Sequence, residues 1–238
     1  MAEVFERYLR QVEVLGFEGQ EKLRRAKVVV VGVGGLGSVV SLYLTAAGVG
    51  ELVLVDNGYL ELSNLNRQIL YNEEDLGKPK ALTAAEKLSK LNSEVRVRGI
   101  QADVGSEEVV DEVRSATLVI DCLDNWRSRL ILDKIAWDSK KPLIHGGISE
   151  FYGQVTTIVP EVTTCLKCLL GIDEKVREEK PPQVLGPTPG VVGAIEAMEA
   201  IKYLTGRGEL LINKLLVIDL KRMEFTTLKI FGRENCTC

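Results

Sequence analysis

The sequence lacks the excess of basic residues that is typical of nucleic-acid binding proteins. Its 238 residues include 30 Lys and Arg against 34 Asp and Glu, which gives a net charge of −4. Binding along a phosphate backbone normally leaves a basic excess, so the charge balance argues against a general nucleic-acid binder and leaves room for a local basic pocket. Hydrophobic residues make up 45% and charged residues 27%, as in an ordinary globular protein with a substantial core.

The sequence also lacks a recognisable signal peptide. The N-terminus does not show the basic-then-apolar order of such a segment. Residues 28–50 carry no charge and are long enough to cross a bilayer, but they contain six glycines together with Ser38, Ser41 and Thr45. A buried strand, turn and helix explain this stretch better than a membrane span. We therefore expect a cytoplasmic protein without membrane association.

Cysteine is scarce and odd in number. With five cysteines and no export signal, the sequence argues against a disulfide scaffold and favours metal ligation or free thiols. Cys165 and Cys168 form a C-x-x-C pair, and Cys236 and Cys238 form a second pair at the end of the sequence. Four thiolates from two distant segments suit tetrahedral structural zinc, which would tie the C-terminal tail to the rest of the chain. Free thiols and a redox pair remain alternatives, although the thioredoxin-like pattern expected around a redox pair is absent.

Apolar runs alternate with helical segments over residues 1–150. Short runs rich in Val, Ile and Leu are typical of strands that are buried on both faces of a parallel sheet. Their alternation with helices predicts a Rossmann-like, doubly wound α/β sheet with mostly parallel strands. The expected strands are 27–31, 51–56, 95–100, 117–121 and 142–144, and the expected helices are 2–25, 38–47, 78–91, 107–114 and 126–139.

The pattern changes after residue 150. Strands at 154–159, 214–219 and 224–230 have hairpin-like spacing and predict an antiparallel extension of the sheet, with a helix at about 191–204. Residues 171–186 include a charged, proline-rich stretch that cannot bury much apolar surface, so we expect a mobile surface loop there. We therefore predict a single domain with a nucleotide-binding half, 1–150, and an antiparallel extension, 151–238.

A glycine loop follows the first predicted strand. Gly32, Gly34, Gly35 and Gly37 fit the pattern G-x-G-x-x-G between a strand and a helix. Glycine lets the backbone turn tightly and approach a phosphate, while the amides at the start of the helix face the anion. Asp56 ends the second strand, where its carboxylate can accept hydrogen bonds from a ribose. The pattern predicts a nucleotide site and by itself favours a dinucleotide, with helix–strand packing as the alternative reason for the glycines.

Polar and cationic residues soon after Asp56 shift the prediction towards a triphosphate. Arg67 stands in a polar segment that also holds Ser63 and Asn64, and Lys80 opens the next helix. A redox enzyme that binds one pyrophosphate has little need for such cations. Arg and Lys can stabilise the charge that develops on a triphosphate as the bond between its α- and β-phosphates breaks. As isolated residues they would be surface charges, but their place at the carboxyl edge of the sheet favours a functional role.

A carboxylate and an amide side chain follow the fourth strand on the same edge. Asp124 and Asn125 come directly before the helix expected at residue 126. Hard cations prefer carboxylate and phosphate oxygens, so Asp124 is a candidate ligand for Mg²⁺ beside the phosphates. The alternative is that Asp124 caps this helix. Asp121, at the end of the strand itself, better fits a structural role.

The series of motifs resembles the MoeB/ThiF/HesA family, the single-domain relatives of ubiquitin-activating enzymes. The resemblance includes Arg7-Tyr-Leu-Arg10-Gln11 near the N-terminus and spans nearly the whole sequence, in order and with compatible spacing. It implies an ATP-dependent adenylyltransferase that acts on a ubiquitin-like sulfur carrier of the MoaD or ThiS type, with a C-terminal Gly-Gly. Carried over by position, it implies that Gly35 lies against the nucleotide, Asp56 binds the ribose, Asn64, Arg67 and Lys80 contact phosphates, Asp124 organises Mg²⁺, and Arg10 reaches the triphosphate of the other subunit of a homodimer.

Two departures from the family pattern matter. The second cysteine pair is C-x-C, where the family normally has C-x-x-C. Many relatives also place a cysteine in the loop before the run that corresponds to residues 183–187, whereas this sequence has none between Cys168 and Cys236. We therefore expect adenylation without a covalent intermediate on a loop thiol, with Cys122 packed in the core and His145 in a structural role. An NAD-dependent oxidoreductase and a non-catalytic binding scaffold remain the alternative functions.

Overall fold

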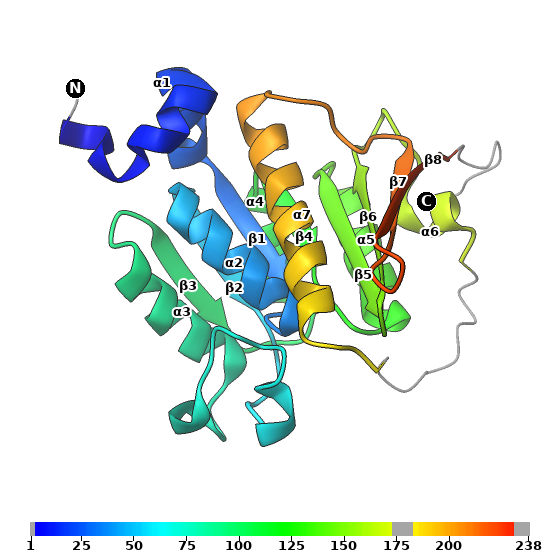
Figure 1. The fold of residues 1–238 in the computed structure, drawn as a ribbon, viewed down its shortest axis with the longest axis horizontal. Coiled ribbons are helices and arrows are strands. Elements are labelled where there is room, and N and C mark those ends of the chain that lie inside the picture. The colour runs from blue at the N-terminus through cyan, green and yellow to red at the C-terminus, as the bar shows by residue number, and fades with distance from the viewer. Residues whose placement is uncertain (1–2, 173–182, 231–238) are drawn as a thin grey trace.

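The structure is a computed structural model that describes residues 3–172 and 183–230, with side chains from residue 6 onward. Its centre is an eight-stranded sheet with the order β3-β2-β1-β4-β5-β6-β7-β8 (Figure 1). The strands from β3 to β5 are parallel, and β6, β7 and β8 continue the sheet in antiparallel fashion. The strands are β1 (Lys27–Val31), β2 (Glu51–Val55), β3 (Arg96–Ile100), β4 (Leu118–Asp121), β5 (Leu143–Ser149), β6 (Tyr152–Ile158), β7 (Lys214–Asp219) and β8 (Glu224–Lys229).

Helices cover both faces of the parallel part of this sheet. In Figure 1, α2, α3 and α7 lie in front of the sheet, while α4 and α5 lie behind it. This layering agrees with the predicted doubly wound fold and its antiparallel extension. The α-helices are α1 (Leu9–Arg25), α2 (Gly35–Ala47), α3 (Lys80–Leu91), α4 (Glu107–Ser115), α5 (Trp126–Asp138), α6 (Leu166–Leu170) and α7 (Pro187–Thr205), and short 3-10 helices are η1 (Glu3–Tyr8), η2 (Leu62–Asn64) and η3 (Glu73–Asp75).

The valine run of β1 explains why this strand occupies the middle of the parallel sheet. Successive side chains of a strand point to opposite faces. Val28 and Val30 pack into the core beneath α2 and α7, and Val29 and Val31 pack into the core beneath α4 and α5. A strand that is covered on both faces needs a continuous apolar run, which is what residues 28–31 provide.

The uncharged stretch 28–50 folds as the expected strand, glycine turn and helix, β1 and α2. Among the residues that the structure describes, no helix has both the length and the apolar character needed to span a membrane.

Strand β5 is longer than predicted. It continues through residue 149 because residues 143–149 pair along their whole length with β6, up to the pair formed by Ser149 and Tyr152. The glycines in this stretch conceal the strand in the sequence. Gly146 is needed because a Cβ there would overlap the carboxyl group of Glu196 on α7.

The segment before α7 also differs from the prediction. Helix α7 begins at Pro187 and not near residue 191, and proline suits the first turn of a helix because it has no amide hydrogen to leave unpaired. Val184 forms a β-bridge with Glu150, whose amide donates to the Gln183 carbonyl at 2.6 Å. The last residues of the predicted mobile loop are therefore fixed against the β5–β6 turn, while 173–182 lie outside the described residues.

The first cysteine pair lies on a short helix that the sequence did not predict. Cys165 is buried at the N-cap of α6, and Cys168 lies within the helix. Asp133 of α5 accepts hydrogen bonds from the amides of Leu166 (2.9 Å) and Lys167 (3.0 Å), which fixes the start of α6. The expected second pair, Cys236 and Cys238, lies outside the described residues. Within those residues, no cluster of three or more potential metal ligands is found.

Candidate nucleotide-binding site

The predicted site residues gather at the carboxyl edge of the parallel strands. The glycine loop follows β1, Asp56 follows β2, and Asp124 follows β4. The chain leaves β1 for β2 on one side, while β4 lies on the other side of β1. A crevice at such a reversal of strand order is the usual ligand site of an open α/β sheet.

Two glycines of the loop are required by packing. Gly32 has a φ of +90°, and a Cβ there would lie 2.6 Å from the Cys122 carbonyl oxygen. A Cβ at Gly37 would overlap the carbonyl oxygen of Gly32, so α2 could not approach the loop as it does. For these two positions, helix–strand packing is therefore sufficient reason for glycine.

The middle of the loop is less constrained. A Cβ at Gly34 would lie 3.6 Å from Gln68 Nε2, an ordinary contact, whereas one at Gly35 would press on Pro189 at 3.1 Å. Gly34 is the N-cap of α2, and no described side chain caps this helix end. The first amides of a helix have no partner within the helix. The start of α2 can therefore receive a phosphate, as the sequence predicts.

Asp56 fixes the glycine loop as well as facing the site. Its carboxylate accepts hydrogen bonds from the amides of Val33 and Gly58, both at 2.8 Å. A Cβ at Gly58 would lie 3.0 Å from Asp56 Oδ1 and 3.5 Å from Lys80 Nζ, so the structure brings this carboxylate and this ammonium group together. Asp56 remains half-buried, and each carboxylate oxygen can accept more than one hydrogen bond. A ribose contact is compatible with its role in the loop.

The polar segment after β2 folds back over the glycine loop. Arg67 Nη1 donates to the carbonyl of Ser63 and to Asn66 Oδ1, both at 3.0 Å, and a Cβ at Gly35 would lie 3.6 Å from Arg67 Cγ. Asn64 is buried, and its Oδ1 accepts from the Glu61 amide at 3.2 Å. Arg67 is thus placed beside the nucleotide loop, while Asn64 also stabilises the turn that holds it there.

The cap of α5 is Asn125, so the alternative that Asp124 caps this helix is wrong. Asn125 Oδ1 accepts from the Ser128 amide at 2.9 Å. Asp124 is exposed and accepts a hydrogen bond from Asn125 Nδ2 at 3.2 Å. Its carboxylate therefore remains accessible at the carboxyl edge, where it could contribute to holding a divalent cation.

A buried polar network beneath Asp124 was not predicted from the sequence. Arg129 Nη1 lies 2.8 Å from Asp121 Oδ2 and donates to the Gly146 carbonyl at 2.6 Å, and Nη2 donates to the Leu123 carbonyl. His145 Nδ1 lies 2.7 Å from Asp121 Oδ2, a distance at which the ring can donate to the carboxylate. A buried Asp followed eight residues later by Arg was the signal, but only the fold shows that both side chains point inward.

Charge within the network follows from burial and pairing. Burial would raise the pKa of Asp121, but the charge of Arg129 and the hydrogen bond with His145 hold that pKa below its ordinary value. Burial and the nearby Arg129 charge lower the pKa of His145. The network is therefore an Arg–Asp ion pair with a neutral histidine, and His145 is not positioned as an exposed base.

Cys122 is buried, as expected, and does not have the properties of a nucleophile. Its Sγ lies 3.9 Å from Glu196 Oε1, and burial is the main cause that raises the pKa of the thiol well above its ordinary value. A thiol that stays protonated is a weak nucleophile.

Arg10 lies far from the site in its own chain. The adjacent Gln11 donates to the carbonyl of Ala47 at 2.9 Å, and Ala47 is the last residue of α2. The glycine loop is at the other end of this helix of 13 residues, about 20 Å away. The structure thus brings together the glycine loop, Asp56, Arg67 and Lys80 on one edge and leaves Arg10 at the opposite edge.

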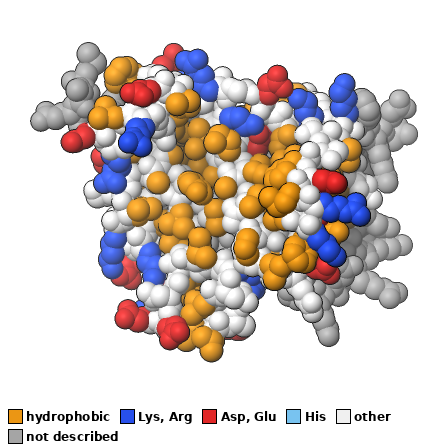
Figure 2. Space-filling view, in the orientation of Figure 1, with side chains coloured by type: hydrophobic (Ala, Val, Ile, Leu, Met, Phe, Trp, Pro, Cys, Tyr) orange, Lys and Arg blue, Asp and Glu red, His pale blue; other side chains and the backbone are white. Residues whose placement is uncertain are grey.

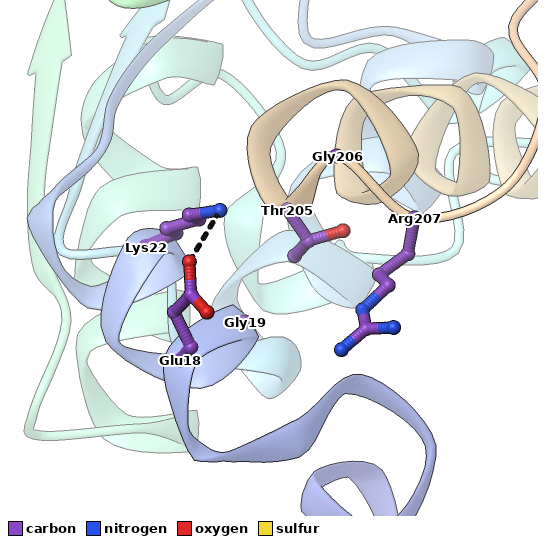
Figure 3. Close-up of a pocket in the computed structure, with 6 residues that line it drawn as sticks. All are labelled: Glu18, Gly19, Lys22, Thr205, Gly206 and Arg207. Atoms are coloured by element: carbon purple, nitrogen blue, oxygen red, sulfur yellow. Dashed lines mark ion pairs between the residues drawn. The ribbon is translucent and has the colours of Figure 1, made fainter.

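A polar hollow at that opposite end is separate from the nucleotide site. It lies between α1 and the C-terminal end of α7 and is lined by Glu18, Lys22, Thr205 and Arg207 (Figure 3). Lys22 and Glu18 form an ion pair at 2.9 Å across one side of it. The other end of α7 contacts the glycine loop through Pro189, so the full length of the helix separates the two.

This geometry defines an α/β nucleotide-binding protein with cationic side chains beside its glycine loop. The ThiF family model matches residues 7–238, and the chain belongs to this family. It is 40% identical over 252 residues to the sulfur carrier protein adenylyltransferase of Thermus thermophilus, covering 98% of this chain and 90% of that protein. It is 35% identical over 234 residues to the molybdopterin-synthase adenylyltransferase of Salmonella typhimurium, covering 97% and 94%.

Solved structures agree with this assignment. The chain resembles the crystal structure of Escherichia coli MccB with ATP at a TM-score of 0.86 and 29% identity, covering 97% of this chain and 73% of that one. The family predicted from the sequence motifs, and the adenylyltransferase class, are confirmed by these relatives.

Proposed function

We propose that the chain binds ATP with Mg²⁺ at the carboxyl edge of its sheet and adenylates the C-terminal carboxylate of a ubiquitin-like sulfur carrier that ends in Gly-Gly. The observation that carries this proposal is the uncapped start of α2 with Arg67, Lys80 and Asp124 gathered on the same edge. The proposal is further supported by relatives named as sulfur carrier protein and molybdopterin-synthase adenylyltransferases and by the likeness to an ATP-bound structure.

The residues present suit a nucleoside triphosphate. The free amides at the start of α2 would receive phosphate oxygens, and glycine at position 34 leaves the backbone accessible. Arg67 and Lys80 would offset negative charge on the phosphates, and Asp56 would accept a ribose hydroxyl. Ser63 and Asn64 hold the segment that carries Arg67, and Asn125 holds the turn that carries Asp124.

The reaction requires charge compensation more than acid–base catalysis. A carboxylate oxygen of the carrier attacks the α-phosphorus of ATP, the bond to the β-phosphate breaks, and pyrophosphate leaves. No proton has to be moved, which agrees with the burial of His145. Mg²⁺, when bound at Asp124, would reduce the repulsion between the carboxylate and the polyphosphate. The product is an acyl-adenylate.

We propose further that no thiol of the crossover loop takes up the activated carrier. The sequence has no cysteine between Cys168 and Cys236, and Cys122 is buried with a raised pKa. Mass spectrometry of the protein after turnover with carrier and ATP is expected to show no carrier joined to the crossover loop, either as a thioester that hydroxylamine cleaves or as a disulfide that a reductant cleaves. Either adduct on this loop would contradict this part of the proposal.

Arg10 fits the proposal only through a second copy of the chain. Helix α1 lies at the top of Figure 1, beside the C-terminal end of α7, so Arg10 cannot reach the nucleotide of its own chain. Hydrophobic side chains gather over the middle of the face that α2 and α7 form (Figure 2), and Tyr43 and Met198 on these helices are both 56% exposed. Such a face suits an isologous homodimer, which would bring the Arg10 of each subunit to the site of the other.

We also propose structural zinc at Cys165, Cys168, Cys236 and Cys238. The support is the burial of Cys165 and the rigid anchoring of α6 by Asp133. Thiolates suit Zn²⁺, and a tetrahedral site would tie the tail to the sheet extension. Metal analysis of the purified protein should give one zinc per chain, and Cys165→Ser should lower that content. The zinc site would be contradicted if the wild-type protein contained no zinc and if added zinc did not change its free energy of unfolding.

A pyrophosphate–ATP exchange assay distinguishes the candidate functions. Exchange that depends on a carrier ending in Gly-Gly supports adenylation. Tight binding of NADH without exchange would instead favour an oxidoreductase, and carrier binding with neither activity would favour a scaffold. Identification of the ubiquitin-like protein that co-purifies with the chain supplies the carrier for this assay.

A further inference from the structure

Arg129 occupies an unusual position for an arginine, because it is 5% exposed and makes several separate polar contacts. Its guanidinium contacts Asp121 at the end of β4, the Gly146 carbonyl in β5 and the Leu123 carbonyl in the turn between β4 and α5. The rigid fork of donors in arginine suits several acceptors at once, which a lysine ammonium cannot match at the same time. Arg129 therefore joins the end of β4, the middle of β5 and the turn that follows β4.

That turn carries Asp124. The carbonyl that Arg129 Nη2 holds belongs to Leu123, so the guanidinium acts on the residue directly before Asp124. On the other side, Asn125 caps α5 and donates to the Asp124 carboxylate at 3.2 Å. The indole of Trp126 lies over the guanidinium, with 5.5 Å between Arg129 Cζ and the ring centroid. The backbone of Asp124 is thus held on both sides while its carboxylate remains exposed.

We infer that Arg129 is a positioning residue for adenylation, one that sets where the Asp124 carboxylate stands at the nucleotide site through the Leu123 carbonyl. This inference rests on the proposed function, since it assigns the consequence to the Mg²⁺-dependent step. A carboxylate that is misplaced by about 1 Å can reduce a catalytic rate by about 100-fold without contact between the altered residue and the substrate.

The direct test replaces the guanidinium group of Arg129 with an ammonium group and so keeps the positive charge. Arg129→Lys retains a cation beside Asp121, so the buried carboxylate keeps a charged partner, but one ammonium group cannot replace the contacts to both Gly146 and Leu123. We expect kcat for pyrophosphate–ATP exchange to fall by about 100-fold, and KM for ATP to rise by no more than the factor by which Mg²⁺ tightens ATP binding in the parent. We also expect a higher Mg²⁺ concentration at half-saturation.

A double-mutant cycle separates positioning from general damage. In a background of Asp124→Asn, the additional change Arg129→Lys should have almost no further effect on exchange, because the group that it positions is already gone. The matched control is Arg98→Gln, which removes an arginine that is paired with Glu51 (3.1 Å) and Glu112 (2.7 Å) at the amino edge of the sheet. Its effect should be small and the same in both backgrounds. Full additivity of Arg129→Lys and Asp124→Asn would overturn the inference.

A binding measurement tests the inference even without turnover. In the background Trp137→Phe, the fluorescence of Trp126 reports from the edge of the site. ATP titrations in Mg²⁺ and in EDTA should show that Mg²⁺ tightens ATP binding in the parent, and that Arg129→Lys removes this gain without weakening binding in EDTA. Absence of exchange in the parent would contradict the proposed function, whereas an unchanged Mg²⁺ effect in Arg129→Lys would contradict the positioning role.

A second variant covers a failure of Arg129→Lys to fold. The pair Arg129→Gln and Asp121→Asn removes both buried charges together, so that neither charge is left unpaired. We expect the same loss of the Mg²⁺ effect on ATP binding. Retention of that effect in this folded double variant would also overturn the inference.

Discussion

Glu196 allows a test of whether a buried carboxyl group beneath the site is protonated in the folded protein. It is fully buried in α7, and its Oε1 lies 3.9 Å from the Cys122 thiol. Its Oε2 has no hydrogen-bond partner in the part of the chain that the structure describes. Burial, followed by the charge of Asp121, raises the pKa of Glu196 well above its ordinary value of 4.5. The folded protein therefore holds a protonated carboxyl group where the unfolded chain would ionise.

The effect of this protonation on the free energy of unfolding follows from proton linkage. Because the folded pKa is raised, the contribution of Glu196 to stability is fully present below pH 4.5, the unfolded value, and is lost as the pH rises towards the folded value. Within that interval the free energy of unfolding falls by about 1.4 kcal/mol per pH unit. The glutamine of Glu196→Gln cannot ionise and has nearly the same shape as glutamate. The free energy of unfolding of this variant, relative to that of the wild type, should therefore rise by about 1.4 kcal/mol for each pH unit in this interval. For a chain of this size, that is about 3–5 °C in Tm per pH unit.

Urea unfolding at pH 5, 6 and 7 measures this difference directly. We expect the curves of wild type and Glu196→Gln to separate progressively as the pH rises, with Glu196→Gln the more stable at pH 7. Glu13→Gln on the exposed face of α1 controls for the removal of one charge. A constant difference between wild type and Glu196→Gln across this range, or one that shrinks as the pH rises, would refute the assignment of a buried neutral acid.

Three further predictions concern the site. Asp124→Ala should reduce pyrophosphate–ATP exchange by at least about 100-fold while leaving the urea midpoint unchanged, because the side chain is exposed and electrostatic stabilisation is lost; exchange at the wild-type rate would refute the metal assignment. Arg10→Ala should impair exchange, and mixing it with Arg67→Ala should partly restore activity, because mixed dimers regain one complete site; no restoration would count against action in trans. Gly37→Ala should destabilise the fold by about 3 kcal/mol, because the added Cβ overlaps the Gly32 carbonyl oxygen. Gly34→Ala should retain the fold and weaken ATP binding. Equal losses of stability for the two variants in urea unfolding would contradict this division of roles.

Local sequence signals were sufficient to predict much of the fold. The valines of β1 alternate between two buried faces, so a continuous apolar run indicated a central parallel strand correctly. The glycine pattern after it marked the turn into α2. The same signals failed for β5, where Gly146 and Gly147 interrupt the apolar run, because that strand is held by pairing with β6 and by close packing against Glu196.

Only those site residues that belong to recognisable sequence motifs could be predicted from the sequence. Asp56, Arg67 and Lys80 were correctly expected on one edge, since strand ends of a parallel sheet meet there. The distinction between Asp124 and Asn125 as helix cap depends on a shift of one residue, which capping preferences do not resolve because both side chains cap well. The contacts of Arg129 could not be assigned from the Asp121–Arg129 spacing alone, since its partners come from the end of β4, the middle of β5 and the turn after β4.

The most direct test of adenylation is the carrier-dependent exchange of labelled pyrophosphate into ATP. The purified chain, Mg²⁺, ATP and a carrier ending in Gly-Gly should give exchange, and the same carrier without its terminal glycine should give none. The mass of the carrier should increase by one adenylyl group, which is AMP less one water, when pyrophosphatase removes the pyrophosphate. Exchange that ignores the carrier terminus, or a chain that binds the carrier and ATP without exchange, would contradict the proposed function.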